Sequence, residues 1–149
     1  MMHVFRRAFS TLLHNRPRQL QVAALCYRKG DGGKEVLLIT SRDTGRWIVP
    51  KGWPIKGKDG AQSALQEAWE EAGVHKAEID AEPIGTYFYE KGCDDGNSIP
   101  IEADVYLAQV TKLRDNYPEA DQRERAWFAP HDAANLVDEP QLRDILRTL

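Results

Sequence analysis

The sequence of 149 residues is poor in cysteine and has no long apolar run. Its two cysteines, Cys26 and Cys93, supply neither a disulfide framework nor the paired spacing of a zinc site. No apolar stretch approaches the roughly 18 residues that indicate a membrane-spanning helix. The four histidines are scattered, without a pair at metal-ligand spacing. These absences argue against a disulfide-stapled fold and a histidine or cysteine metal centre. We expect a soluble, cytoplasmic protein that makes no contact with a membrane.

The charge of the chain is small in total but unevenly distributed. Net charge is −3, yet residues 1–58 hold twelve Lys or Arg against three acids, while the rest holds eight against twenty. A basic front half attracts polyanions, and the acidic remainder argues against general affinity for nucleic acid. A small phosphate-rich ligand is therefore expected, without a stable nucleic-acid complex. A monomer and a homodimer both remain open.

The first eighteen residues differ in composition from the rest. They contain four arginines and no acid. This composition fits an N-terminal arm or a short surface helix, and it superficially matches an organelle transit peptide. From Gln19 the pattern becomes that of a folded domain of ordinary size. We expect an arm at residues 1–18 and a single domain at residues 19–149.

The domain alternates β-forming runs with turn-rich segments. Glycine-rich turns at 29–34 and 91–98 each separate two such runs, which predicts two β-hairpins. Two helices are expected at 130–138 and 139–149. The order of elements predicts an α+β domain with a mixed β-sheet and packed helices. The expected strands are 19–28, 35–42, 46–50, 82–90, 99–110 and 123–129.

After the loop at residues 51–60, a further helix is expected to begin near Gly60 and to end at Gly73. Asp59 is a plausible N-cap and Gln62 completes a capping box. Gly73 is suited to the left-handed conformation of a C-cap. A narrow apolar stripe at helical spacing would lie on the sheet, formed by Ala61, Ala64, Leu65, Ala68 and Ala72.

Three glutamates, Glu67, Glu70 and Glu71, converge on another part of this helix. Like charges at neighbouring helical positions repel each other, and the helix dipole disfavours acids near a C-terminus. A solvated acidic face is the plain alternative. A hard divalent cation offers a physical reason for the cluster, because Mg²⁺ and Mn²⁺ prefer carboxylate oxygens and bridge to phosphates.

The segment from Gly52 to Val74 resembles the signature of the Nudix hydrolases. That signature is Gly, five residues, Glu, seven residues, Arg-Glu-apolar-any-Glu-Glu-any-Gly-apolar. Lys58 replaces its first glutamate and Gln66 replaces its arginine. In the family these two side chains commonly form an ion pair, so the double replacement strands no charge. The matching residues are Gly52, Glu67, Ala68, Glu70, Glu71, Gly73 and Val74.

The resemblance extends over residues 19–149. "EVLLITSRDTGRWIVPKGWP", "IGTYFYEK", "EADVYLAQV" and "NYPEADQRERAWFAPHDAANLV" are similar to the diphosphoinositol-polyphosphate and dinucleoside-polyphosphate phosphohydrolase branch. This implies a Nudix-like α/β/α sandwich. It also implies hydrolysis of a phosphoanhydride bond in a polyphosphorylated small molecule, with Mg²⁺ or Mn²⁺ as cofactor. The replacements at 58 and 66 favour an alternative, a non-catalytic sensor of phosphorylated ligands.

Roles for individual residues follow from the resemblance. The metal would be held by Glu67, Glu70, Glu71 and the carbonyl of Lys51. Catalytic candidates are Glu67, Glu70 and Glu119, one of which would accept the proton of the attacking water. Phosphoryl transfer depends mainly on placement and charge stabilisation, so basic residues are expected to hold the substrate. These are Arg28, Arg42, Arg46, Lys51, Lys56 and Lys58.

Overall fold

The computed structural model describes residues 17–149, so nearly all of the expected arm at 1–18 lies outside the described residues. The elements follow the predicted order closely. They are β1 Gln19–Gly30, β2 Gly33–Thr40, β3 Trp47–Ile48, β4 Lys51–Gly52, α2 Gly60–Ala72, β5 Val74–Ile79, β6 Gly85–Gly92, β7 Ser98–Leu113, β8 Arg125–Phe128, α3 Pro130–Leu136 and α4 Pro140–Arg147. None of these helices has the length and apolar character that a membrane crossing requires.

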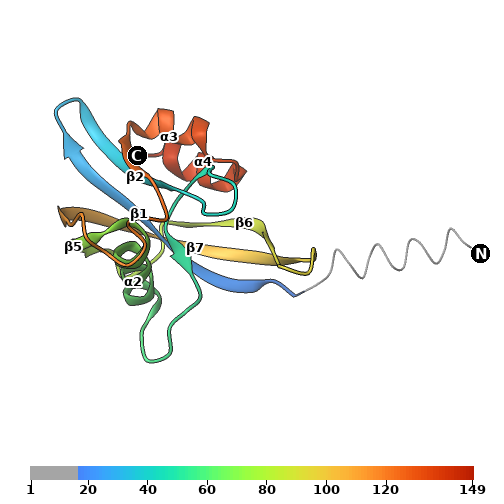
Figure 1. Cartoon of the computed structure of the whole chain (residues 1–149). Coiled ribbons are helices and arrows are strands. Elements are labelled where there is room, and N and C mark those ends of the chain that lie inside the picture. The colour runs from blue at the N-terminus through green and yellow to red at the C-terminus, as the bar shows by residue number, and fades with distance from the viewer. Residues whose placement is uncertain (1–16) are drawn as a thin grey trace, which may run out of the picture.

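The strands form one mixed sheet. Its main path runs β3-β2-β1-β7-β5, with β4 on β1, β6 on β7 and β8 on β2. β1 and β2 pair antiparallel, as do β6 and β7, which confirms both predicted hairpins. The two long central strands, β1 and β7, run parallel. Figure 1 shows α2 on one side of these strands and α3 with α4 on the other. The predicted α/β/α sandwich is therefore confirmed.

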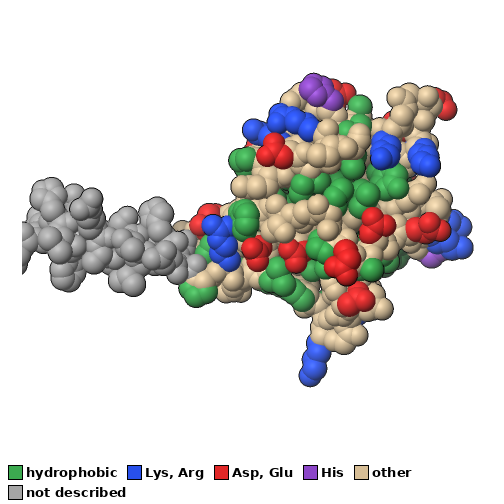
Figure 2. Space-filling view, turned by 180° about the vertical axis from the view of Figure 1, so that it is seen from behind, with side chains coloured by type: hydrophobic (Ala, Val, Ile, Leu, Met, Phe, Trp, Pro, Cys, Tyr) green, Lys and Arg blue, Asp and Glu red, His purple; other side chains and the backbone are tan. Residues whose placement is uncertain are grey.

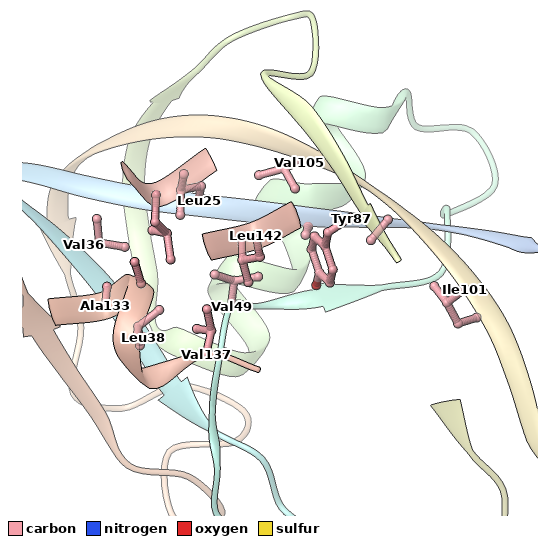
Figure 3. Close-up of a cluster of buried hydrophobic side chains, with 14 residues drawn as sticks. Leu25, Val36, Leu38, Val49, Tyr87, Ile101, Val105, Ala133, Val137 and Leu142 are labelled. Carbon is pink, nitrogen blue, oxygen red and sulfur yellow. The ribbon is translucent and has the colours of Figure 1, made fainter. Parts of the chain in front are cut away.

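Alternation along the strands gives the sheet two apolar faces, because successive side chains point to opposite sides. On β1, Leu25 belongs to the core beneath α3 and α4, whereas Ala24 belongs to the core beneath α2. In Figure 3, Leu25, Val36 and Leu38 from the sheet face Ala133, Val137 and Leu142 from the C-terminal part of the chain. The middle of β1 is buried on both faces, which explains its continuous apolar run, whereas on β7 buried residues largely alternate with half-buried ones.

Helix α2 begins and ends as predicted. The Asp59 carboxylate accepts a hydrogen bond from the Gln62 amide (2.8 Å), and the Gln62 side chain accepts one from the Asp59 amide (3.0 Å). Gly73 ends the helix in the left-handed conformation, with φ 72°. Small side chains let the helix lie close to the sheet, since Ala64 and Ala68 are fully buried. Leu65, predicted to belong to this stripe, is only partly buried and lies outside it.

Two strands were not predicted. β5 carries exposed polar side chains such as His75 and Lys76, and its apolar residues, Val74, Ala77 and Ile79, do not alternate regularly. Its strand conformation comes from irregular pairing with β7. β4 was assigned to the loop after Pro50, and its two residues pair with β1. The predicted ends also shift: β8 is shorter than 123–129, and both C-terminal helices begin at a proline and end earlier than predicted.

Candidate active site

One face of α2 is fixed to the start of the loop that precedes it. The Ser63 hydroxyl accepts a hydrogen bond from the Ile55 amide (3.1 Å). Two turns further on, a carboxylate oxygen of Glu71 accepts one from the Lys51 amide (3.4 Å). Residues four apart lie on the same helix face. The helix and the loop are thus held side by side, and the position midway between the two contacts is occupied by Glu67.

The carboxyl group of Glu67 lies directly against the backbone of Gly52. A Cβ built on Gly52 would overlap this carboxyl group, so only glycine leaves room for it. The pKa of Glu67 is raised to about 7, first by burial and then by three neighbouring carboxylates, Glu71, Glu70 and Glu119. Four predicted site residues therefore come together, from one helix and one distant loop.

Glu71 is almost fully buried, with 4% of its surface exposed. Burial raises its pKa, and the nearby cations Arg123 and Lys51 offset part of this effect. Burial also lowers the pKa of Lys51, while the charge of Glu71 acts in the opposite direction. Lys51 thus contributes its amide hydrogen bond to Glu71 and a nearby positive charge.

Arg123, which was not predicted as a site residue, connects two of these carboxylates. Its side chain is 7% exposed, and its Nε and Nη2 lie 3.2 and 3.1 Å from Oε1 of Glu119. Nη2 is also 3.6 Å from Oε1 of Glu71, and Nη1 donates to the carbonyl of Thr40 (3.1 Å). The only signal in the sequence is the four-residue spacing between Glu119 and Arg123.

Glu70 makes two contacts, one with the loop that carries Glu119 and one with Gln66, which stands where the signature has arginine. Its carbonyl accepts a hydrogen bond from the Glu119 amide (3.0 Å). Its carboxylate accepts one from the side-chain amide of Gln66 (2.9 Å). Gln66 therefore keeps a contact with Glu70 but supplies a neutral donor where the signature has a cation.

The signature residues thus occupy a buried loop-helix arrangement that gathers carboxylates, and the family model of the NUDIX domain matches residues 17–149. The chain belongs to the Nudix family. The match spans all the described residues, so the sandwich is a Nudix fold and α2 is its signature helix.

Named relatives and solved structures agree with this membership. Diphosphoinositol polyphosphate phosphohydrolase 3-alpha of Mus musculus is 31% identical over 121 residues, covering 78% of this chain and 68% of the relative. The Homo sapiens protein of the same name is 29% identical over 120 residues, with the same shares covered. The crystal structure of Ap4A hydrolase from C. elegans matches with a TM-score of 0.68 at 26% identity, covering 88% of this chain and 95% of that one. This chain is an enzyme of the Nudix pyrophosphohydrolase class.

Predicted substrate contacts fall into two groups in this Nudix domain. Arg42 and Lys51 adjoin the carboxylates: Nη1 of Arg42 lies 3.4 Å from Oε1 of Glu119, and Lys51 contacts Glu71 as described. Arg46 is engaged elsewhere, with Nη1 2.6 Å from the buried carboxylate of Glu139. The structure therefore brings Arg42 and Lys51 to the carboxylates, while Arg46 already has a partner.

The other predicted contacts lie further from the carboxylates. Arg28 ion-pairs with a neighbour on β2. It is six positions along β1 from Val22, the partner of Gly52, which is roughly 20 Å at about 3.3 Å per residue. Lys56 and Lys58 are exposed in the loop before α2. Lys58 lines a groove on the other side of α2. A role for these residues in substrate binding remains a prediction.

Nudix hydrolases generally need divalent metal ions. The donor set suits such an ion, because it consists of carboxylate oxygens in a partly buried, negatively charged place. Within residues 17–149, however, no three His, Cys, Asp or Glu side chains are arranged as a ready-made metal site. Glu71 and Glu119 contact Arg123 instead, and Glu70 contacts Gln66. The residues fit a metal chemically, and three of these carboxylates already have partners in the protein.

Proposed function

We propose that this chain hydrolyses a phosphoanhydride bond in a diphosphoinositol polyphosphate or a dinucleoside polyphosphate, with Mg²⁺ or Mn²⁺ as cofactor. The observation that carries the proposal is the carboxylate cluster around Glu67, in which burial and like charge raise the pKa to about 7. The names of the relatives support both substrate classes, since they include diphosphoinositol polyphosphate phosphohydrolases and an Ap4A hydrolase.

The metal would be held by the carboxylates of Glu67, Glu70 and Glu71, with the carbonyl of Lys51 as a further ligand. When bound, the ion supplies positive charge to the phosphate oxygens and acidifies water. Arg123 also contacts Glu71, and we expect this ion pair to loosen when the metal binds. Gly52 contributes by leaving room for the carboxyl group of Glu67.

Glu67 and Glu119 are the two candidates for the base that accepts a proton from water. A base is most effective when its pKa lies near the working pH, and Glu67 has this property in the metal-free protein. Glu119 lies across from it on a loop, where Arg123 holds one of its carboxylate oxygens. We propose Glu67 as ligand or base and Glu119 as the alternative base.

Arg42 and Lys51 are proposed to hold substrate phosphates. Phosphoryl transfer needs the phosphate chain positioned and its charge neutralised more than it needs covalent catalysis. Arg42 is exposed, and its partner Glu119 is on the site. An arginine in this position suits paired hydrogen bonds to phosphate oxygens. Lys56, on the exposed loop, would reach only the outer part of a long ligand.

The proposal is tested by a substrate panel with the purified full chain, in Mg²⁺ and in Mn²⁺. The panel contains a diphosphoinositol polyphosphate and a diadenosine polyphosphate, and released phosphate or mononucleotide is measured. Glu70→Gln is expected to lower kcat at least about 100-fold, the scale of losing one catalytic group. Glu78→Gln, at an exposed position on β5, is the control and should retain full turnover.

Two results would contradict this proposal. Full turnover in Glu70→Gln would remove Glu70 from the metal site. Tight binding of a panel member without metal-dependent turnover would support the sensor instead, although the phosphohydrolase relatives favour the enzyme.

We further propose a cytoplasmic location and no stable complex with nucleic acid. Both cysteines are free thiols, which suits a reducing compartment. Figure 2 shows acidic side chains gathered across the middle of one face, which disfavours a phosphate backbone there. The proposed chemistry needs residues of one chain only, so it holds for a monomer and for a homodimer.

A further inference from the structure

A groove lies on the other side of α2 from Glu67. It is an open groove of about 1150 Å³ between α2, the edge strand β5 and the loop that follows β7. Figure 1 shows α2 and β5 next to each other at this side of the sheet. Gln62, Gln66 and Trp69 face the groove, whereas Glu67 faces the loop, as the 100° step between helix residues requires. The groove is therefore separate from the carboxylate cluster.

The rim of the groove is positively charged. Lys58, Lys76 and Arg114 line it, and within residues 17–149 none of the three has an ion-pair partner. Arg114 contacts the ring of His75 (3.1 Å), which is a neutral neighbour when His75 is unprotonated. The acid on the rim, Asp115, is already ion-paired with an arginine of β8 (2.8 Å). Positive charge thus remains available to a ligand.

The pKa of His75 also reflects this concentration of positive charge. Desolvation lowers the pKa of His75, and the charges of Arg114, Lys112 and Lys76 lower it further. Lys112 lies beside Lys76 in the β5–β7 register. This local charge stands out because residues 59–149 hold eight basic against twenty acidic side chains. A local positive field of this kind attracts anions.

The floor of the groove is partly apolar and aromatic. Leu65 and Trp69 lie on it, and the ring of Trp69 meets that of His75 at 6.0 Å between centroids. Side-chain amides of Gln62 and Asn116 stand at its sides. An aromatic surface beside cations and amides suits a ligand that has both phosphate and a flat ring.

The two departures from the Nudix signature both belong to this groove. Lys58 and Gln66 line it, and together they carry a charge of +1 where a Glu and Arg pair would carry none. Gln66 also donates its hydrogen bond to Glu70. A ligand in the groove would therefore contact a side chain that itself contacts the carboxylate cluster.

We infer that the groove between α2 and β5 is a second binding site, for a phosphorylated small molecule with an aromatic ring, that is, a nucleotide. The phosphate contacts the cations on the rim, and the ring lies against Trp69. The site binds without hydrolysis and without a metal, so it does not depend on the function proposed above.

The test titrates three probes into the ¹⁵N-labelled full chain in EDTA: AMP, inorganic phosphate and adenosine. The indole N–H of Trp69 and the side-chain amide of Gln66 are followed by NMR. Both signals should move with AMP to saturation. The variant Lys76→Glu/Arg114→Glu should bind AMP at least about tenfold more weakly, which corresponds to about 1.4 kcal/mol. The control, Lys29→Glu/Arg147→Glu, has the same charge change at exposed positions elsewhere and should bind like the parent.

Each alternative result overturns a stated part of the inference. Signals of Trp69 that do not move, or a control that binds as weakly as the groove variant, would remove the site. Inorganic phosphate, which has a charge similar to that of the AMP phosphate, would remove the nucleotide assignment if it bound as tightly as AMP, and adenosine binding as tight as AMP binding would remove the role of the cations. The spectra also report folding of each variant. Since no metal or turnover is involved, failure of the hydrolase proposal would leave these results unchanged.

Discussion

Gly52 and Glu67 show how the site depends on the size of a single side chain. The absence of a Cβ at position 52 lets a carboxyl group lie on the backbone, close to three other carboxylates. The sequence signature located both residues and the neighbouring Glu70. It gave no indication of Arg123. That residue lies far along the chain, just before β8, and its contacts with the carboxylates exist only in the folded protein.

The substitution Gly52→Ala should separate activity from stability. The new methyl group would displace the carboxyl group of Glu67, the flexible end of a side chain, so the thermal unfolding midpoint should stay near that of the parent. Turnover should fall about 100-fold, as expected for a misplacement of about 1 Å in a catalytic group. Gly92→Ala, where a Cβ meets no atom, is the matched control. Equal turnover in both variants would contradict the assigned role of Glu67.

A second prediction concerns pH in the metal-free protein. The pKa of Glu67 rises from 4.5 to about 7 on folding, so the folded chain binds the proton more tightly than the unfolded chain. Its contribution to stability is fully present below about pH 4.5 and is lost as pH rises through 7. In EDTA, Glu67→Gln should therefore gain stability relative to the parent between pH 5 and 8, measured as urea midpoints. A difference independent of pH would show that Glu67 titrates normally.

Helix α2 is the element that connects sequence, sheet and site. Its caps and its alanine stripe are readable from sequence because they depend on neighbouring residues. Its C-terminal end also depends on distant residues: Arg125 donates to the carbonyl of Ala72 (2.8 Å) and packs on the ring of Tyr117. Strand β5 begins directly after α2 and was not predicted, because its largely polar sequence forms a strand only through pairing with β7.

An alanine at the end of α2 would destabilise the fold through backbone strain and through a packing clash. Comparison of two glycines separates these two contributions. Gly73 and Gly96 both have positive φ, 72° and 84°, so alanine strains the backbone at each by about 1–2 kcal/mol. At Gly73 the new Cβ would also lie 2.6 Å from the carbonyl oxygen of Arg114, whereas at Gly96 it meets nothing. Gly73→Ala should therefore lower the free energy of unfolding by about 1–3 kcal/mol more than Gly96→Ala. Urea unfolding measures both, and equal losses would exclude the packing contribution.

The whole molecule is one sheet shared between two apolar cores. α3 and α4 cover one core and α2 covers the other, so the site helix is supported by the same strands that hold the C-terminal helices. Val22, Ala24 and Cys26 of β1 face α2, and all three are buried. Opening the α2 side of the molecule would expose Cys26, which makes this thiol a probe of the whole fold.

Thiol labelling should distinguish the two cysteines by their burial. Burial raises the pKa of Cys26 to about 12, so neither access nor ionisation favours its reaction. Cys93, in the β6–β7 loop, is partly exposed. The native chain should therefore react quickly at one thiol and at the second only in denaturant, and Cys93→Ser should show no fast reaction. Fast labelling of Cys26 in the native chain would contradict its burial.

By itself, the sequence determined the features that depend on residues close together in the chain. It predicted the two hairpins, the capped helix at 60–72, the α+β class and the positions of the signature glutamates, since turn chemistry, capping and helical spacing are local. These features were sufficient to indicate the family.

Only the tertiary structure decided how those parts meet. It placed Glu119 and Arg123 against α2, kept Arg28 at the far end of β1, and made a strand of residues 74–79. It also showed that Lys58 and Gln66 share a groove apart from Glu67. Contacts between distant residues depend on burial and on the pairing of whole strands, and no local pattern in the chain specifies them.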